Sequence, residues 1–509
     1  MENRSKAMSS NRNEIKSAIR LPSVLAIGFT GHRKLPNEAV SRRLICDFLE
    51  QEKAATPDIV YGVSSVAAGA DLLFAESCLE LDVPLRVLLP LSIEEFRKDF
   101  DEETWSRVEQ VLSKAVSVEI IANSELRNEG YYECGIETVQ QSEMLVALWD
   151  GEPSRGMGGT QEIVSFAEKM GRPVVWFHSA TGTRNVLNEP ALQHLEQLRD
   201  PELDFLNGLP DLGATLSSNS SEDLVKAWLD KIDKNASRFA PQVRRLSSIP
   251  IVCTAAAAFF SGGGLKVPHA EFWLAFGTGL GVTAALLPFA LRLNRRQALW
   301  ARTRTAAEVC RSRLALWGAP NFEEVIGPEI VPELAGILMT LKLLKAFDAS
   351  RKPRSIDSFK YHYKKERVLD QMDYFARNSL RSANEARKYR IAIGVFIGLA
   401  ILIAATLWVK GLALGNAQLF PGERWLAVAI PALFQLATVA AALLVVHDCE
   451  RRQRRYRELH DWLEEWDVEL GVLKTWPTLL KVAGRIERAL LVELLEWKSL
   501  VKNIKLPRK

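Results

Sequence analysis

Residues 391–409 read IAIGVFIGLAILIAATLWV, and residues 425–446 read WLAVAIPALFQLATVAAALLVV. Neither run contains a charged residue. Each is close in length to the roughly 20 residues that a helix needs to cross the hydrocarbon core of a bilayer. Trp408 and Trp425 flank the short connection, where aromatic residues of the membrane interface are expected. The two runs therefore predict a transmembrane hairpin.

Basic residues flank this hairpin at both outer ends. They are Arg387, Lys388 and Arg390 before it and Arg451, Arg452, Arg454 and Arg455 after it. The connection contains only Lys410, Glu423 and Arg424 as charged residues. Because an excess of Lys and Arg marks the cytoplasmic side, we expect a multi-pass protein of the inner membrane with cytoplasmic N- and C-termini. The same cations can attract anionic lipid.

A second, weaker pair of apolar runs lies upstream, at 249–265 and 272–291. Arg244 and Arg245 precede this pair, and Arg292, Arg295 and Arg296 follow it. The first run is rich in Ala and Gly, and small residues favour close helix packing in lipid. The pair predicts a second hairpin, giving four transmembrane helices. The alternative for both pairs is two buried hairpins of a large soluble core.

The overall composition limits the remaining function classes. The chain has 509 residues, enough for two to four domains, and its net charge of +3 gives no reason to expect a nucleic-acid partner. None of the six cysteines forms a CxxC pair, so the sequence predicts neither a metal site nor a disulfide scaffold. Residues 1–20 lack the apolar stretch of a secretory signal and are expected to be a flexible lead-in.

Short apolar segments alternate with helical segments in the N-terminal third of the chain. Strands are expected at 24–29, 59–63, 84–89, 116–121, 144–149 and 173–178. Such alternation is typical of an α/β domain with a Rossmann-like, doubly wound parallel sheet.

Three turns beside these strands carry small and polar residues that suit a ligand. They contribute Thr30, Gly31, His32 and Arg33, then Ser64, Ser65, Gly69 and Asp71, then Gly158, Gly159, Thr160 and Glu162. Ligands of such sheets bind at the carboxyl ends of the strands, where Gly lets the backbone approach a phosphate and a helix start attracts an anion. We therefore expect a nucleotide-like ligand and no other cofactor, with Arg33 as an anion clamp. Alternatively the glycines only permit tight turns, and Asp71 is either a ribose contact or a helix-start charge.

The three motifs TGHR (30–33), SVAAGAD (65–71) and GGTQE (158–162) resemble the SLOG superfamily over about residues 21–180. That superfamily includes lonely-guy cytokinin-activating enzymes, DNA-processing protein A and sensor domains of anti-phage systems. The resemblance implies binding of a nucleotide second messenger, either a cyclic oligonucleotide or an ADP-ribose derivative. The lonely-guy enzymes have a fuller P-G-G-x-G-T-x-x-E turn. The alternative function, a nucleotide N-glycoside hydrolase using Glu162 with Arg33 or Arg155, therefore lacks part of its motif.

The helix that enters the second hairpin carries Tyr363, Arg367, Gln371 and Tyr374 at regular steps. This pattern, over about 355–500, is similar to the SLATT family of membrane effectors. The resemblance implies an effector of bacterial anti-phage defence and abortive infection, which opens a pore or disrupts the membrane. It also implies a partner enzyme of the TIR or nucleotidyltransferase type that makes the signal. For Tyr363, Arg367 and Gln371 themselves, we expect interhelical packing and polar pairing.

The expected domain limits follow from these assignments. Residues 181–245 are predicted to be a linker, 246–296 the first hairpin, 297–387 cytoplasmic helices, 388–448 the second hairpin and 449–509 C-terminal cytoplasmic helices. Ile486, Leu490, Leu494, Trp497 and Val501 form a helical stripe, which predicts bundle packing or a homo-oligomer. A passive membrane scaffold is a third possibility, which leaves the sheet-edge motifs unexplained.

Overall fold

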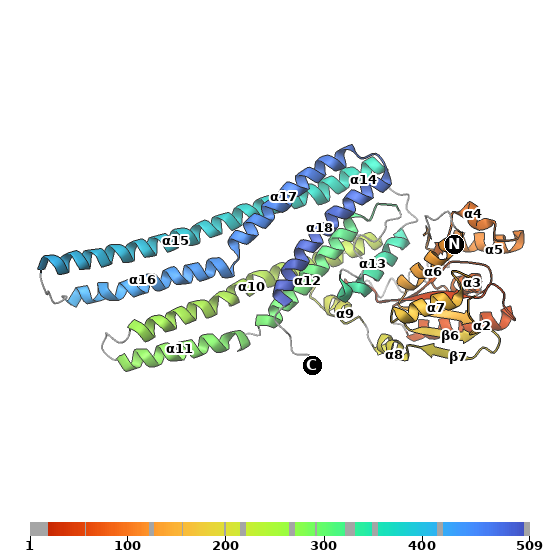
Figure 1. The fold of residues 1–509 in the computed structure, drawn as a ribbon, viewed down its shortest axis with the longest axis horizontal. Helices are drawn as coiled ribbons and strands as arrows, with labels where there is room; N and C mark the ends of the chain where they lie inside the picture. The colour runs from red at the N-terminus through yellow and green to blue at the C-terminus, as the bar shows by residue number, and fades with distance from the viewer. Residues whose placement is uncertain are drawn as a thin grey trace. The chain divides into compact units, whose positions relative to one another are not determined.

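The computed structural model describes residues 19–55, 58–121, 127–154, 156–197, 200–213, 220–263, 270–290, 293–320, 331–348, 355–414 and 421–502. The chain forms two compact units (Figure 1). The first, an α/β unit, comprises residues 1–231 and 316–353, and the second, a helical unit, comprises residues 232–315 and 354–509. The chain therefore passes from one unit to the other three times.

The α/β unit contains a seven-stranded sheet in the order β4-β3-β2-β1-β5-β6-β7. The strands are β1 Val24–Gly31, β2 Ile59–Ser64, β3 Leu85–Leu89, β4 Ser117–Ile120, β5 Met144–Trp149, β6 Val174–His178 and β7 Arg184–Leu187. All pairings are parallel except that of β7 with β6. This confirms the prediction of a largely parallel sheet. The chain steps outward from β1 to β4 and then returns to the other side of β1, so the topological switch point lies between β1 and β5.

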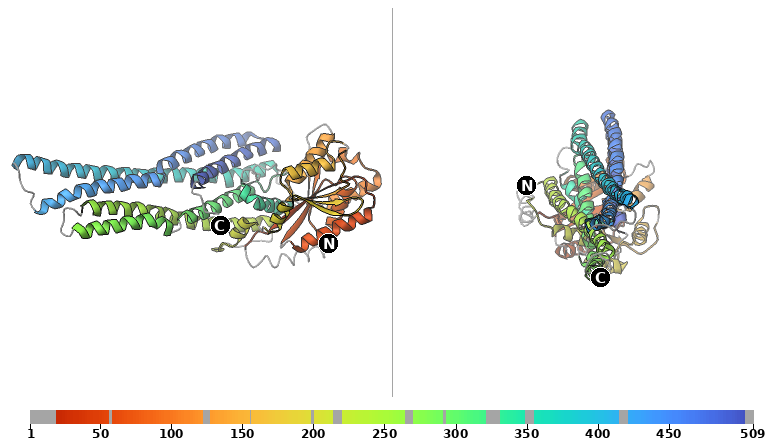
Figure 2. Two further views of the ribbon diagram at one scale, coloured as in Figure 1. Left: turned by 60° about the horizontal axis from the view of Figure 1, so that its bottom comes forward. Right: turned by 90° about the vertical axis from the view of Figure 1, so that its left-hand side faces the viewer.

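Helices cover both faces of this sheet (Figure 2). They include α2 Glu38–Ala55, α3 Ala70–Glu80, α4 Ile93–Arg97, α5 Glu102–Lys114, α6 Arg127–Gln140 and α7 Thr160–Lys169. Alternate residues of β1 separate onto the two faces: Ile27 and Phe29 pack with α2, α3 and α5, whereas Ala26 packs against α6. The rings of Phe29 and Phe74 stack at 4.5 Å. Because both faces are buried, the central strands are nearly continuous apolar runs.

One helix of the sheet's second face comes from far along the chain. This is α13, Ala335–Asp348, which follows the short 3₁₀ helix η2, Pro332–Leu334. Leu343 of α13 is fully buried against Ala26, Tyr61 and Leu88, and the Tyr61 hydroxyl donates to the sulfur of Met339 at 3.6 Å. The sequence analysis grouped these residues with the cytoplasmic helices at 297–387. In the structure they complete the core of the α/β unit.

Residues 181–245, expected to be a linker, contain further elements of the α/β unit. In addition to β7, these are α8 Glu189–Gln197, α9 Pro201–Asn207 and the start of α10, Ser221–Gly263. The indole of Trp228 is fully buried and donates to Asn207 Oδ1 at 2.9 Å, and the amide of Leu21 donates to the same oxygen at 3.0 Å. The amino-terminal end of α10 is therefore fixed to the chain segment that enters β1.

The helical unit contains the remainder of α10 and eight further helical segments among its described residues. They are α11 Ala270–Ala290, α12 Leu293–Ala315, α14 Ile356–Tyr363, the π-helix η3 Lys364–Leu369, α15 Asp370–Leu414, α16 Pro421–Val446, α17 Cys449–Val472 and α18 Trp476–Lys502. Asp448 adopts a left-handed conformation, with φ of +50°, where α16 gives way to α17. Helix α15 lies beside α16 and then beside α17 (Figures 1 and 2).

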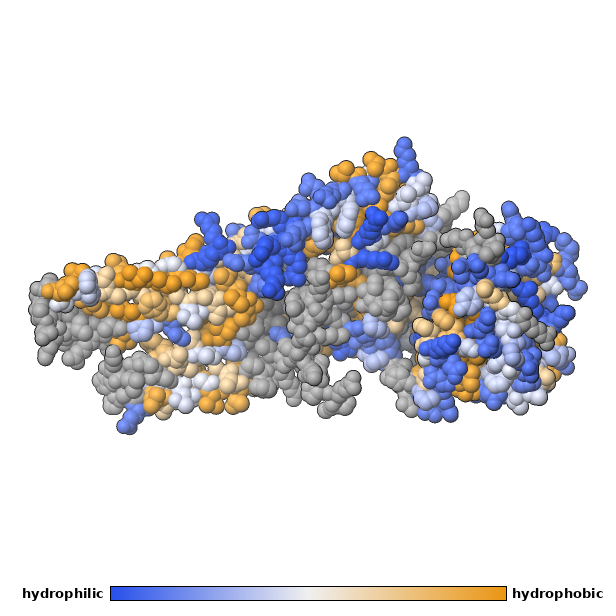
Figure 3. Space-filling view, in the orientation of Figure 1, coloured by the Kyte–Doolittle hydropathy of each residue, from blue (hydrophilic) through white to orange (hydrophobic). Residues whose placement is uncertain are grey.

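Among the described residues of this unit, two helices are long and apolar enough to cross a membrane, Ile356–Leu412 and Val428–Val472. Only 6% and 11% of their most apolar stretches are buried inside the protein. Trp408 is 69% exposed and Val445 is 76% exposed, and apolar side chains gather on the surface of α15 and α16 (Figure 3). Such a surface is unfavourable in water and suited to lipid. The first predicted hairpin contains two shorter apolar stretches, Ser248–Phe260 and Glu271–Leu287.

A buried ionic cluster joins three helices of the helical unit. Arg367 of η3 contacts Glu487 of α18 at 2.6 Å and Glu308 of α12 at 2.8 Å, and the hydroxyl of Tyr363 donates to Glu487 at 2.9 Å. Burial opposes ionisation of Glu308, but Arg367 and Arg311 outweigh it and lower the pKa of this carboxyl to about 2. The contacts confirm the interhelical pairing expected for Tyr363 and Arg367. Gln371 is partly buried on the next turn.

Candidate functional site

The first predicted turn lies where β1 ends at the switch point. The backbone amide of His32 donates to the carbonyl of Leu148 on β5 at 3.1 Å, and the amide of Ala70 at the start of α3 donates to the carbonyl of His32 at 3.0 Å. Thr30 pairs with Ala147 of β5 in the sheet register. The backbone around His32 therefore joins the carboxyl ends of β1 and β5 to the turn that follows β2.

The imidazole of His32 faces a carboxylate that the sequence analysis did not identify. Its Nε2 lies 3.0 Å from the amide nitrogen of Asp150 and 3.0 Å from Oδ1 of Asp150. A neutral ring accepts a hydrogen bond from the amide, whereas a protonated ring pairs with the carboxylate. Burial opposes ionisation of Asp150, but the amide of Glu152, 3.0 Å from Oδ1, and His32 outweigh it and lower the pKa of Asp150. The available signal for Asp150 was its position directly after the fifth strand.

The turn between β2 and α3 has a backbone that only small residues allow. Gly69 has a φ of +89°, and a Cβ atom there would lie 2.4 Å from the carbonyl oxygen of Arg33. A Cβ on Gly31 would lie 2.5 Å from Cβ of Ala70. Val66 is fully buried with a φ of +51°, a conformation that β-branched residues rarely adopt. The glycines thus allow the first two turns to pack closely against each other.

Asp71 connects the first two turns through buried hydrogen bonds. Its side chain is buried, and Oδ1 accepts a hydrogen bond from the Ser65 hydroxyl at 3.0 Å. Burial raises the pKa of Asp71 to about 7, although Ser65, the Gly31 amide and Arg33 oppose the shift. The hydroxyl of Ser64 donates to the Asp71 carbonyl at 3.2 Å. This geometry favours a structural role for Asp71 over the ribose contact that the sequence analysis left open.

The third turn precedes α7 and is stabilised by the carboxylate of Glu162 in the first turn of that helix. Gly158 has a φ of +80°, and its amide donates to Oε2 of Glu162 at 2.7 Å. A Cβ on Gly159 would lie 1.9 Å from the hydroxyl of Ser154, so this glycine permits a close approach within the turn. Thr160 is buried at the first position of α7. Arg155, named with Glu162 in the hydrolase alternative, lies outside the described residues.

Tyr131 of α6 connects the first and third turns. The exposed guanidinium of Arg33 lies 4.7 Å from the centre of the Tyr131 ring, a cation–π arrangement. A Cβ on Gly158 would lie 3.3 Å from Cβ of Tyr131. The Tyr131 hydroxyl donates to Asp99, which also pairs with Arg127 at 2.5 Å. The structure thus brings all three predicted turns to one edge of the sheet, with Arg33 held at its exposed rim.

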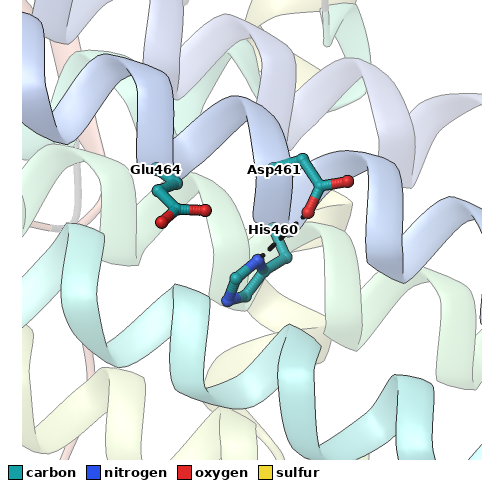
Figure 4. A group of neighbouring side chains, drawn as sticks. All are labelled: His460, Asp461 and Glu464. Atoms are coloured by element: carbon teal, nitrogen blue, oxygen red, sulfur yellow. Dashed lines mark hydrogen bonds and ion pairs between the residues drawn. The ribbon is translucent and has the colours of Figure 1, made fainter.

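Another cluster of potential ligand atoms lies on α17, formed by His460, Asp461 and Glu464 (Figure 4). One ligand atom of each residue lies within 4.8 Å of the others, and Nδ1 of His460 is 3.3 Å from Oδ1 of Asp461. Asp461 and Glu464 are exposed, and all three are neighbours on one helix. Acidic groups commonly gather in this way on helix surfaces without a metal, and we assign no site here.

Comparison with known proteins identifies no family. No protein-family model matches the chain, and no curated protein matches it. Among solved structures, the chain is similar to DNA processing protein A from Helicobacter pylori, which was described for its single-stranded DNA binding mode. The identity is 14%, the match covers 36% of this chain and 79% of that one, and the TM-score is 0.24. A likeness of this size supports no inference, so the SLOG and SLATT resemblances stay predictions.

Proposed function

We propose that this chain is a membrane effector controlled by a nucleotide second messenger. In this proposal the α/β unit binds the messenger at the switch point, and the helical unit then opens a pore or disrupts the bilayer. One observation carries it: a single chain joins three converging sheet-edge turns to long helices with outward-facing apolar side chains. The SLOG-like and SLATT-like motifs support a role in bacterial anti-phage defence, in which a TIR or nucleotidyltransferase enzyme would make the messenger.

The chemistry of the sheet edge suits a phosphate-bearing ligand. Two helices, α3 and α7, begin at this edge, and helix starts present partial positive charge and backbone donors to an anion. Arg33 adds an exposed cation whose planar guanidinium matches phosphate oxygens. A cyclic oligonucleotide or an ADP-ribose derivative would offer the phosphates for these donors.

The membrane part of the proposal includes both hairpins. Helix α11 contains 21 residues, which corresponds to about 31 Å and matches the hydrocarbon core. Its side chains Phe272, Val282 and Leu286 are exposed, as are Ile249 and Val252 of α10. Four crossings would give a multi-pass inner-membrane protein, and the flanking arginines would keep both termini cytoplasmic. Outward-facing apolar helices also suit a homo-oligomer.

Chain connectivity supplies a physical route for the signal. Helix α12 of the helical unit is followed by α13 of the α/β unit, and α13 is followed by α14 and α15, the latter leading into the second hairpin. Because α13 packs on the sheet, a rearrangement of the sheet edge can move both flanking segments. The messenger drives such a change only if its affinity differs between the two states.

We do not extend the proposal to nucleotide hydrolysis. Glu162, the carboxylate named in the hydrolase alternative, already accepts the Gly158 amide through Oε2 and so stabilises its own turn. That contact favours a structural role over proton transfer.

The test uses the full chain in detergent, screened for thermal stabilisation by cyclic dinucleotides, cyclic trinucleotides, ADP-ribose and cyclised ADP-ribose. A ligand that binds only the folded state raises the unfolding temperature. In the Arg33→Gln variant, loss of one charge-assisted phosphate contact should weaken binding roughly 10- to 100-fold. Arg43→Gln on α2, another exposed arginine, is the matched control. The active ligand should also release dye from vesicles containing the wild-type chain. Stabilisation by none of these ligands would contradict the sensor proposal.

A further inference from the structure

The cations beside the second hairpin form a compact group across two helices. Arg390 of α15 pairs with Glu450 of α17 at 3.4 Å, and Arg452 of α17 pairs with Glu385 of α15 at 3.0 Å. We call the group the basic collar. It comprises Arg387, Lys388, Arg390, Arg451, Arg452, Arg454 and Arg455, with Glu385, Asp448 and Glu450 among them. The collar therefore carries an excess of four positive charges, directly beside the apolar stretches at 391–409 and 425–446.

Acidic residues of the collar neutralise only some of its cations. Besides the two pairs above, Arg451 and Arg455 contact Asp448 at 3.8 and 3.9 Å. Arg387, Lys388 and Arg454 are exposed and have no acidic partner within the described part of the chain. These three cations are therefore accessible to a partner outside the protein.

Helix geometry places two of these three cations at headgroup depth. The polar layer on each side of a bilayer is about 5–7 Å thick, and a helix rises about 1.5 Å per residue. Arg387 and Lys388 precede Ile391, where the apolar stretch begins, by four and three positions, or about 5–6 Å along the helix. Arg454 lies in the second turn of α17, after the break at Asp448, and its long side chain can extend back toward the headgroups. Arg381, ten positions before Ile391, lies about 15 Å away and beyond that layer.

We propose that Arg387, Lys388 and Arg454 bind the phosphates of anionic phospholipids in the leaflet that surrounds the collar. This rests on the membrane insertion in the proposed function. Guanidinium groups contact phosphate oxygens through two parallel hydrogen bonds, and an ammonium group acts as a compact point charge. The ion pairs of Arg390 and Arg452 hold α15 to α17, and the three unpaired cations supply the attraction. A phosphodiester with net negative charge, as in phosphatidylglycerol, fits this chemistry, whereas the zwitterionic headgroup of phosphatidylcholine does not.

The test titrates the full chain, in neutral detergent micelles, with short-chain phosphatidylglycerol or phosphatidylcholine and follows thermal stabilisation. The wild-type chain should prefer phosphatidylglycerol, and raising the salt concentration should reduce that preference. Removing two cations near the headgroups, in R387Q/K388Q, should weaken phosphatidylglycerol binding roughly 30-fold. The control R381Q/R457Q removes two exposed cations from the same helices beyond headgroup depth and should bind as the wild type does.

Three results would overturn the inference. They are an equal response of the wild type to both lipids, an unchanged preference in R387Q/K388Q, and an equal loss in the control variant. Alkaline extraction of the chain reconstituted in phosphatidylcholine separates this inference from the proposed function. A chain that stays in the bilayer without a phosphatidylglycerol preference contradicts the lipid site alone. A chain that alkali extracts contradicts membrane insertion and, with it, the lipid site.

Discussion

Replacing Arg367 by Met should lower the stability of the helical unit. The guanidinium of Arg367 is shared by Glu308 and Glu487, and both carboxylates are buried, Glu487 completely. Burial opposes the charge on Arg367, but Glu487 and Glu308 outweigh it and raise the pKa of the guanidinium further. Methionine fills a similar volume without the charge. The R367M variant therefore leaves two carboxylates buried among fewer cations.

The expected loss follows from the cost of an uncompensated buried charge. Removing one member of a buried ion pair costs about 3–5 kcal/mol. Glu308 keeps Arg311 as a partner, whereas Glu487 keeps the Tyr363 hydroxyl, so most of the cost should arise at Glu487. For a unit of this size, about 3–5 kcal/mol corresponds to a fall of roughly 6–20 °C in the unfolding midpoint. Replacing all three groups with apolar residues should recover much of this loss, because apolar packing avoids the desolvation cost.

The assay is thermal unfolding of the full chain in detergent, followed by circular dichroism at 222 nm, where the helices dominate. Arg377→Met is the control, because Arg377 is an exposed arginine that donates to the carbonyl of Asp373 on its own helix and forms no ion pair within the described part of the chain. The control should change the midpoint by less than roughly 2 °C. Equal midpoints for R367M and the wild type would refute the reasoning, as would a further loss in the variant R367M/E308L/E487L.

Three further predictions concern the α/β unit. D71N should stabilise the unit at pH 8 more than at pH 4, as measured by denaturant unfolding. Because the pKa of Asp71 is raised to about 7 in the folded state, the wild type loses stability as the pH rises from about 4 to 7. The neutral Asn side chain carries no such penalty. G69A should destabilise the unit and reduce ligand-induced stabilisation, because the new Cβ would lie 2.4 Å from the Arg33 carbonyl; Gly171→Ala, at an open positive-φ site, is the control for backbone strain alone. L343A should cost about 2–5 kcal/mol in the same unfolding assay, the usual cost of emptying a buried leucine site.

Local sequence pattern was sufficient for most of the sheet. The six residues of β5, MLVALW, form a continuous apolar run, and the first five of them are buried. Strand β7 escaped prediction because it has only four residues, two of them the exposed Arg184 and Asn185, and such a segment resembles a polar loop. Its identity depends on antiparallel pairing with β6, a contact that no local pattern displays.

The glycine turns could be predicted because each carries its own signal, but their partners could not. Gly69 and Gly158 stand out as glycines, and both have positive φ angles. Asp150 and Tyr131 carry no motif, since their importance comes from contacts with His32 and Arg33 across the fold. Glu162 was predicted from its motif as a ligand-binding residue, and sequence alone did not reveal that it accepts the Gly158 amide and supports its own turn.

The position of α13 in the chain determines how the α/β unit is connected to the helical unit. A fragment of residues 1–240 would contain the whole sheet but would leave Tyr61 and Leu88 without Leu343, so it would expose apolar surface on one face. Because the chain passes between the units three times, the α/β unit cannot be removed by a single cut near residue 240. A sensor attached through one flexible linker could bind its ligand without disturbing the helices. Here the helix that completes the sheet's core lies between α12 and α14 in the chain, so the α/β unit is built from two separate stretches of sequence.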